Sequence, residues 1–145
     1  MNITRRDAMV IGAGSVALAA LPIGALAQDA PVKTADEWIA EFAAGAEVTE
    51  GEGVTLTAPE IAENGNTVPV SVEAPGATEI LLLAPGNPTP GVATFKFGPL
   101  AGSQKASTRM RLAKTQDVVA VAKLADGKVV KTSSEVKVTI GGCGG

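Results

Sequence analysis

The residue best suited to chemistry in this chain is Cys143, its only cysteine and the third residue from the end. Two glycines precede it (Gly141 and Gly142) and two follow it (Gly144 and Gly145). Glycine adopts almost any backbone angle, and chain ends outside a sheet are usually mobile, so these residues predict a thin, flexible arm. If the last strand ends just before the glycines, the thiol reaches roughly 10 Å beyond it, at about 3.3–3.6 Å per extended residue. This geometry suits a thiol that carries a bound group into the active sites of other proteins.

The composition limits what this thiol does alone. The chain has no histidine, which excludes a Ser-His-Asp triad, a Cys–His pair and histidine-based metal sites. It has no second cysteine, and the nearby terminal carboxylate disfavours the thiolate. Activation of Cys143 is therefore expected to come from a partner's site. The chain is predicted to be a carrier without a cofactor or metal, not an enzyme. An incidental thiol and an intermolecular disulfide are the alternatives.

The charge balance is mildly acidic, with 12 Lys and Arg against 15 Asp and Glu. Aromatic residues make up only 3% of the chain. A basic surface with interleaved aromatic side chains is typical of nucleic-acid binding, so this composition argues against a nucleic-acid partner.

Residues 1–27 have the pattern of an export signal. A charged start at Arg5-Arg6 precedes an apolar stretch over residues 8–21. Ala25-Leu26-Ala27 has the small-x-small form of a cleavage site, which predicts a mature chain that begins at Gln28. The apolar stretch is too short and too weakly hydrophobic for a stable membrane span, so no membrane association is predicted.

The paired arginines resemble those of a twin-arginine signal, with Ala8 and Met9 in place of the Phe and Leu usual in that motif. The ordinary secretory route is the alternative. The signal predicts that the protein is located in the periplasm. Because the twin-arginine route exports folded cargo, a partner subunit that folds and travels with this chain is expected.

Residues 28–50 form an N-terminal segment with one predicted helix over residues 34–44. Thr34 and Glu37 make a capping box, in which each side chain satisfies a backbone amide of the other residue. An apolar face follows at i, i+3, i+4 and i+7 spacing, made by Ala35, Trp38, Ile39 and Phe42. Gly45 is the predicted end of the helix, and Trp38 is predicted to pack it on a sheet.

Residues 51–140 have the pattern of short strands separated by turns. The predicted strands cover residues 54–57, 67–73, 78–84, 93–97, 105–112, 118–124, 128–132 and 135–140. Asp126-Gly127 is a hairpin signal, and Pro69 indicates an edge or a bulge. In the last strand, Val136, Val138 and Ile140 are predicted to face inward. The pattern predicts an all-β, immunoglobulin-like antiparallel sandwich, followed directly by the arm at residues 141–145.

Two of these strands bear on possible partners. Ile80-Leu81-Leu82-Leu83 is apolar on both faces, so it is either buried on both sides or half-buried with one face toward a partner. In the 105–112 strand, one face carries a basic row: Lys105, Ser107, Arg109 and Arg111. This row predicts a solvated face, and a surface for an anion or an acidic partner is the alternative.

Taken together, the chain resembles the SoxY family, the sulfur-carrying subunit of the periplasmic Sox thiosulfate-oxidising system. The resemblance rests on Gly141–Gly145 after a terminal strand, on the twin-arginine-like start, and on Ile61-Ala62-Glu63-Asn64-Gly65 followed by Val68-Pro69-Val70. It covers essentially the whole mature chain. The GGCGG terminus is its specific part.

The resemblance implies that Cys143 is a covalent substrate platform for separate enzymes. A c-type cytochrome would join thiosulfate oxidatively to this cysteine as a cysteine S-thiosulfonate. A hydrolase would release sulfate and leave a persulfide, which a sulfane dehydrogenase would oxidise before hydrolysis restores the thiol. The resemblance also implies a heterodimer with a SoxZ-like subunit, for which the apolar 80–83 strand is a candidate interface.

Two other functions compete with this interpretation. A ubiquitin-like sulfur carrier also ends in Gly-Gly, but it carries sulfur on its terminal carboxylate after activation by ATP. Export argues against it because ATP is scarce outside the cytoplasm, and the strand-rich pattern lacks a long central helix. The second is an exported β-sandwich assembly module, which would use Cys143 for an intermolecular disulfide.

Overall fold

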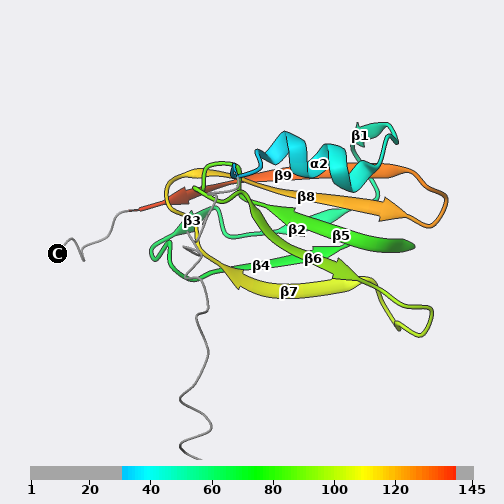
Figure 1. The fold of residues 1–145 in the computed structure, drawn as a ribbon. Helices are drawn as coiled ribbons and strands as arrows, with labels where there is room; N and C mark the ends of the chain where they lie inside the picture. Colours follow the sequence, from blue (N-terminus) through cyan, green and yellow to red (C-terminus); the bar gives the residue numbers. More distant parts are fainter. Residues whose placement is uncertain (1–30, 140–145) are drawn as a thin grey trace, which may run out of the picture. The chain divides into compact units, whose positions relative to one another are not determined.

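The computed structural model describes residues 31–139 of the chain (Figure 1). The predicted signal peptide at residues 1–27, Ile140 and the predicted arm at residues 141–145 lie outside the described residues. Within residues 31–139 the chain forms one α-helix and nine strands. No helix in this range is long and apolar enough to cross a membrane.

Helix α2 (Ala35–Ala43) confirms the predicted helix and its start. The amide of Thr34 donates a hydrogen bond to Glu37 Oε2 at 2.6 Å, and the amide of Glu37 donates one to Thr34 Oγ1 at 3.3 Å. This capping box satisfies backbone amides that have no partner inside the first turn. The helix ends at Ala43, one residue before the predicted last residue, Ala44. Ala44 already takes a left-handed conformation with φ 49°, and Gly45 after it also has a positive φ of 88°.

The larger sheet has six strands in the described part of the chain. Five lie in the order β1 (Val48–Glu50), β9 (Val129–Val138), β8 (Gln116–Leu124), β5 (Ala77–Leu83) and β6 (Gly91–Lys96). The sixth, β3 (Ile61–Ala62), also pairs with β9. The smaller sheet consists of β2 (Thr55–Thr57), β4 (Val68–Glu73) and β7 (Lys105–Met110). The two sheets form the predicted immunoglobulin-like sandwich (Figure 1).

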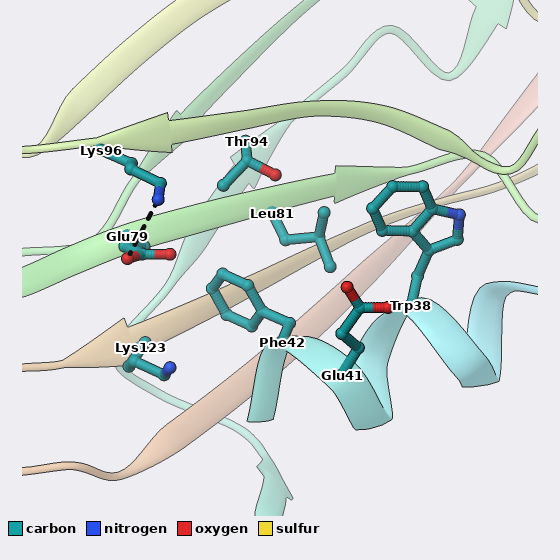
Figure 2. Close-up of a pocket in the computed structure, with 8 residues that line it drawn as sticks. All are labelled: Trp38, Glu41, Phe42, Glu79, Leu81, Thr94, Lys96 and Lys123. Carbon is teal, nitrogen blue, oxygen red and sulfur yellow. Dashed lines mark ion pairs between the residues drawn. The ribbon is translucent and has the colours of Figure 1, made fainter. Parts of the chain in front are cut away.

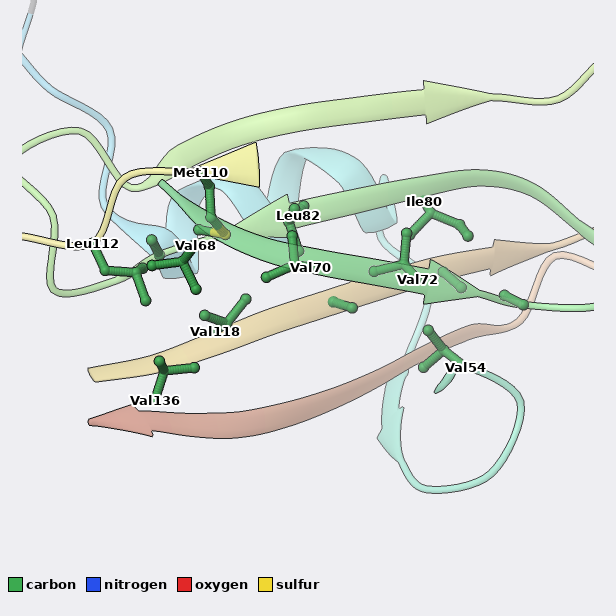
Figure 3. Packing of buried hydrophobic residues seen from close by; sticks show 14 of the residues in the cluster. Val54, Val68, Val70, Val72, Ile80, Leu82, Met110, Leu112, Val118 and Val136 are labelled. Atoms are coloured by element: carbon green, nitrogen blue, oxygen red, sulfur yellow. The ribbon is translucent and has the colours of Figure 1, made fainter. Parts of the chain in front are cut away.

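The main core lies between the two sheets and follows the alternation of the strands. In β4, Val68, Val70 and Val72 are buried, whereas Pro69 and Glu73 are exposed. Figure 3 shows these valines against buried side chains of both sheets, among them Ile80, Leu82, Val118 and Val136. Burying each such side chain contributes about 1.5–3 kcal/mol, so the period-two pattern fixes which face of each strand turns inward.

Strand β5 is buried on both faces, which decides between the alternatives that the sequence left open. Ile80 and Leu82 belong to the core between the sheets, and Leu81 and Leu83 pack under helix α2. All four side chains are at most 2% exposed. The interpretation of residues 80–83 as an interface for a partner subunit is therefore wrong, because the chain's own helix covers the outer face.

Trp38 packs helix α2 on the larger sheet, as predicted. Its indole lies so close to β6 that a Cβ added at Gly91 would come within 2.7 Å of Trp38 Cε2. A glycine at this position therefore lets the ring approach the strand.

Three features of the strands differ from the sequence expectations or refine them. Strand β9 is continuous, whereas two separate strands were predicted over residues 128–132 and 135–140. Strands β1 and β3 were not predicted, and both run parallel to β9 in an otherwise antiparallel sandwich. Pro69 lies at a locally open edge, since β2 ends opposite Ser71 and only β7 pairs with Pro69. The basic row that begins on β7 and ends at Arg111 is exposed, which both the solvated face and the alternative of a binding surface require.

Candidate functional site

The sequence places the candidate site at Cys143, which lies outside the described residues together with Gly141, Gly142, Gly144 and Gly145. The last described residue, Thr139, stands four positions before Cys143. The structure therefore describes the segment from which the predicted arm departs. We call Lys137–Thr139, the end of β9 and the residue after it, the arm base.

One edge of the arm base is held by β3. The amide of Lys137 donates a hydrogen bond to the carbonyl oxygen of Glu60 at 2.9 Å, and the amide of Thr139 donates one to that of Ala62 at 3.0 Å. These two bonds continue the parallel pairing one residue beyond the end of β9. Backbone order therefore extends to Thr139, and this short strand positions the start of the predicted arm.

The other edge of the arm base is held by a side chain from the loop between β7 and β8. Thr115 Oγ1 accepts a hydrogen bond from the amide of Val138 at 3.0 Å and donates a long one of 3.5 Å to its carbonyl oxygen. A single hydroxyl thus occupies both main-chain groups of Val138 that face β8. Strand β8 begins only at Gln116, so Thr115 extends the sheet contact by one residue with a side chain.

Gly65 lets a turn come close beneath the arm base. The amide of Leu112 donates a hydrogen bond to the carbonyl oxygen of Gly65 at 2.7 Å. A Cβ at Gly65 would lie 2.5 Å from the carbonyl oxygen of Leu112 and 2.9 Å from Val138 Cγ1. The turn at Asn64-Gly65-Asn66, just before β4, is thus also a contact point, and only a glycine fits there without displacement of the backbone.

A network of two side-chain amides, Gln116 and Asn87, joins the two loops next to the arm base. Gln116, the only buried polar side chain among residues 31–139, donates from Nε2 to Asn87 Oδ1 at 2.8 Å and accepts from the amide of Gly86 at 2.8 Å. Asn87 in turn donates to the carbonyl oxygen of Arg111 at 2.7 Å and accepts from the amide of Ala113 at 2.9 Å. These bonds join the two loops and limit their relative movement, with the buried Gln116 at the inner end and the half-buried Asn87 at the outer end.

The two edges of the arm base differ in charge. Glu60 and Glu63 flank β3, and both are exposed. Arg111 and Lys114 lie in the loop that carries Thr115, and neither forms an ion pair with any residue in the range 31–139. The arm base therefore stands between an acidic edge and a basic edge.

Two carboxyl groups have shifted pKa values, and neither belongs to the arm base. The backbone amide of Thr34, followed by its hydroxyl, lowers the pKa of Glu37 by hydrogen bonding. The backbone amide of Lys128 lowers the pKa of Asp126 in the hairpin between β8 and β9 in the same way. Both groups are fully exposed, and both stabilise local structure at a helix start or a turn.

A hollow of about 270 Å³ lies beside helix α2, far from the arm base (Figure 2). Trp38 and Phe42 of the helix stand over Leu81 and Thr94 of β5 and β6, with Lys123 Nζ 5.4 Å from the centre of the Phe42 ring. Lys123 pairs with Val129, the first residue of β9, whereas the arm base is at its other end. In the described part of the chain no cluster of His, Cys, Asp or Glu is suited to hold a metal ion.

Comparison with known proteins places the chain in a family. The family model described as sulfur oxidation protein SoxY matches residues 39–143, which is most of the chain and extends to Cys143. This chain belongs to the SoxY family. The solved structure of the sulfur carrier protein SoxY from Chlorobium limicola f thiosulfatophilum is 42% identical, with a TM-score of 0.64, and the match covers 72% of this chain and 96% of that one. No curated protein matches the sequence.

The SoxY fold is also shared with proteins of low sequence identity. A superoxide reductase (neelaredoxin) from Ignicoccus hospitalis is 18% identical with a TM-score of 0.54, over 61% of this chain and 81% of that one. At this identity the likeness concerns the fold alone. The SoxY assignment therefore rests on the family match and on the Chlorobium structure.

In this SoxY chain, sequence reasoning missed the residues that hold the arm base. Thr115 belongs to a loop and carries no periodic signal, and β3 is only two residues long. Gly65 and Asn87 lie between the predicted strands, and nothing in their spacing indicated their partners. These contacts join residues that are far apart in the sequence.

Proposed function

We propose that this chain is a periplasmic covalent sulfur carrier of the Sox thiosulfate-oxidising system and that Cys143 carries the sulfur. The observation that carries the proposal is the SoxY family match over residues 39–143, which ends on the chain's only cysteine. The described arm base supports it, because a hydrogen-bonded strand end stands four residues before this thiol. A fixed origin and a short glycine-rich tail suit a group that visits several enzymes.

The proposed chemistry takes place on the sulfur of Cys143. A c-type cytochrome accepts two electrons as the thiolate and thiosulfate join to form a cysteine S-thiosulfonate. A hydrolase then adds water across the terminal sulfur bond, which releases sulfate and protons and leaves a persulfide. A sulfane dehydrogenase removes electrons from that persulfide while water supplies oxygen, and a last hydrolysis releases sulfate and restores the thiolate.

In this proposal the chain itself is not an enzyme. It offers Cys143 neither a histidine base nor a second thiol, since the sequence contains no histidine and no other cysteine. The enzymes that dock on it would supply the catalytic groups. A SoxZ-like subunit is the proposed partner in a heterodimer. Residues 80–83 are excluded as its interface because helix α2 covers Leu81 and Leu83, and the core between the sheets holds Ile80 and Leu82.

The deciding experiment is intact mass spectrometry of the protein purified from the periplasm of cells supplied with thiosulfate, before and after reduction. The proposal expects reducible adducts with the mass of a thiosulfate group or of one or more sulfur atoms, mapped to the peptide that holds Cys143. A Cys143→Ser variant is the control and should carry none. A clean thiol, or only a disulfide-linked homodimer, would instead support the assembly module.

A second test concerns the glycines of the proposed arm. Gly142→Pro restricts the backbone beside Cys143 and removes a rotatable bond, so we expect slower turnover with the Sox enzymes and an unchanged unfolding temperature. Gly102→Pro, in the exposed loop between β6 and β7, controls for the introduction of proline elsewhere. Equal turnover of Gly142→Pro and the natural protein at saturating enzyme concentration would show that backbone flexibility beside Cys143 is not needed for turnover.

A further inference from the structure

Strand β7 leaves one edge of the smaller sheet open. It is the last strand of that sheet, and in the described part of the chain it pairs with β4 alone. In an antiparallel pair, residues whose main-chain groups bond to the partner strand alternate with residues whose groups point away. The amide of Ala74 donates to the carbonyl oxygen of Gln104 at 2.9 Å, which fixes this alternation for the strand that follows. The main-chain groups of Lys105, Ser107 and Arg109 therefore point away from β4.

The main-chain groups along this edge are available to another chain. Among the amides and carbonyl oxygens of Lys105, Ser107 and Arg109, only the carbonyl oxygen of Arg109 has a partner within residues 31–139, a long bond of 3.5 Å from Thr108 Oγ1. An edge of this kind is complementary to an extended segment, which supplies donors and acceptors at the same spacing. The pairing of β6 with β5 shifts register next to Leu83, which interrupts the edge of the larger sheet on the same side, whereas the pairing of β7 is regular.

The side chains of the same residues give the β7 edge a positive charge. Lys105, Ser107 and Arg109 are exposed on the outer face of the sheet. Lys105 Nζ lies 3.9 Å from Glu73, a weak surface contact, whereas Arg109 stands opposite Pro69 and forms no ion pair with any residue in the range 31–139. An added strand places its own side chains directly opposite these residues, where opposite charges attract. Asp and Glu are therefore favoured at those positions.

The alternate positions of an added strand face the apolar side of the sheet. Ala106, Phe95 and Phe97 pack against the main core and stay partly exposed. Strands β6 and β7 end their sheets on the same side of the sandwich, so these side chains form a rim along its open side (Figure 1). Apolar side chains at the alternate positions of an added strand would cover this rim.

We propose that the free edge of β7 is a docking site for an extended segment of a partner protein in which acidic and apolar residues alternate. The main-chain groups of Lys105, Ser107 and Arg109 bond to the segment, and its acidic side chains lie beside the two cations. Because β7 leads into the loop that holds the arm base, a partner bound here is brought next to the start of the predicted arm. The inference goes beyond the proposed function, since it does not depend on what Cys143 carries.

The test titrates three synthetic peptides into the 15N-labelled protein and follows its amides by nuclear magnetic resonance. The first peptide alternates glutamate and valine. The second replaces each glutamate by lysine, and the third is the first peptide with an N-methyl group on the backbone nitrogen of each glutamate. We expect only the first peptide to shift the amides of Lys105, Ser107 and Arg109 and to slow their hydrogen exchange. Its binding should weaken as salt screens the charges.

Variants of the edge separate strand pairing from attraction by charge alone. Ser107→Pro removes the free amide in the middle of the edge, keeps both cations and breaks no bond to β4. It should weaken binding of the first peptide about fivefold or more relative to Ser107→Ala, which corresponds to the loss of one backbone hydrogen bond. Arg109→Gln should weaken binding by up to about fivefold. Lys128→Gln makes the same charge change in the hairpin between β8 and β9 and should have no effect.

Two results would overturn the inference. Equal binding by Ser107→Pro and Ser107→Ala, or equal binding of the N-methylated peptide, would show that charge alone attracts the peptide. The absence of any shift with the first peptide would show that the cations only guard the edge against pairing, which is a common role of positive charges on edge strands.

Discussion

Thr115 and Val138 are joined through one hydroxyl group, which accepts a bond from the amide of Val138 at 3.0 Å and reaches its carbonyl oxygen at 3.5 Å. This contact lies at the last position of β9, where the partner strand β8 has already ended. It therefore holds Val138 on the side of β9 that faces β8, while the pairing with the β3 segment holds the other side as far as Thr139.

Replacing Thr115 with valine keeps the shape of the side chain and removes the hydroxyl. We expect a loss of about 1 kcal/mol or less in the free energy of unfolding, because the bond is exposed to water. Hydrogen exchange at the amide of Val138 should quicken by up to about tenfold, since 1.4 kcal/mol corresponds to a factor of ten. Thr115→Ser retains the hydroxyl and is the control. Unchanged exchange in Thr115→Val would show that β3 alone holds the arm base.

Gly65→Ala is expected to strain the turn beneath the arm base. The added Cβ would lie 2.5 Å from the carbonyl oxygen of Leu112, which is backbone and moves only with its loop. Such overpacking costs about 1–3 kcal/mol, which denaturant unfolding would detect. Gly98→Ala is a matched control, because a Cβ there has no atom within 4 Å. Equal stability of the two variants would contradict the close contact.

Leu81→Ala tests the contact between helix α2 and β5. Leu81 is 2% exposed, so the change should cost about 2–5 kcal/mol. Trp38 is the only tryptophan and packs in the same cluster, so its fluorescence should shift to longer wavelength if the helix loosens. Leu100→Ala, at a side chain that is 99% exposed, should stay within about 0.5 kcal/mol of the natural protein. A stable Leu81→Ala variant with unchanged fluorescence would reopen this strand as a partner interface.

The capping box predicts an acid dependence of stability. Hydrogen bonds from Thr34 lower the pKa of Glu37 in the folded protein, so its contribution to stability is complete above the ordinary pKa of the unfolded chain's glutamate, about 4.5. It is lost as the pH falls through the lower folded pKa. Glu37→Gln should therefore lower the free energy of unfolding at pH 7. It should also make this free energy fall less steeply as the pH drops below about 4.5, as measured by helix circular dichroism. Glu52→Gln, in an exposed turn, should leave the fall of stability at low pH unchanged. An equal effect of both variants would contradict the assignment of this fall to Glu37.

Much of the fold followed from local patterns. The spacing of Thr34 and Glu37 set the start of helix α2, and the alternation of Val68, Val70 and Val72 identified the inner face of β4. These features depend on groups a few residues apart, or on the period of a strand, and both are visible in a single sequence. The SoxY resemblance was likewise carried by the sequence, and the family match confirmed it.

Other features required the assembled molecule. Leu81 and Leu83 have the same character as Ile80 and Leu82, so no local signal told whether the outer pair meets a helix or another protein. Strand β3 is two residues long and exists because Glu60 and Ala62 offer carbonyl oxygens to β9. Parallel pairing of so short a segment has no period to detect.

The sequence by itself determined that there is one thiol, that glycines surround it, and that a strand precedes it, since these are facts of residue type and order. Only the tertiary structure decided where that strand ends and what surrounds its end. Thr115, Gly65 and Ala62 come from three separate segments, and they act on Val138 and Thr139 through distances that folding alone creates. Contacts between residues so far apart in the sequence cannot be predicted from local spacing, because each depends on how whole strands pair and pack.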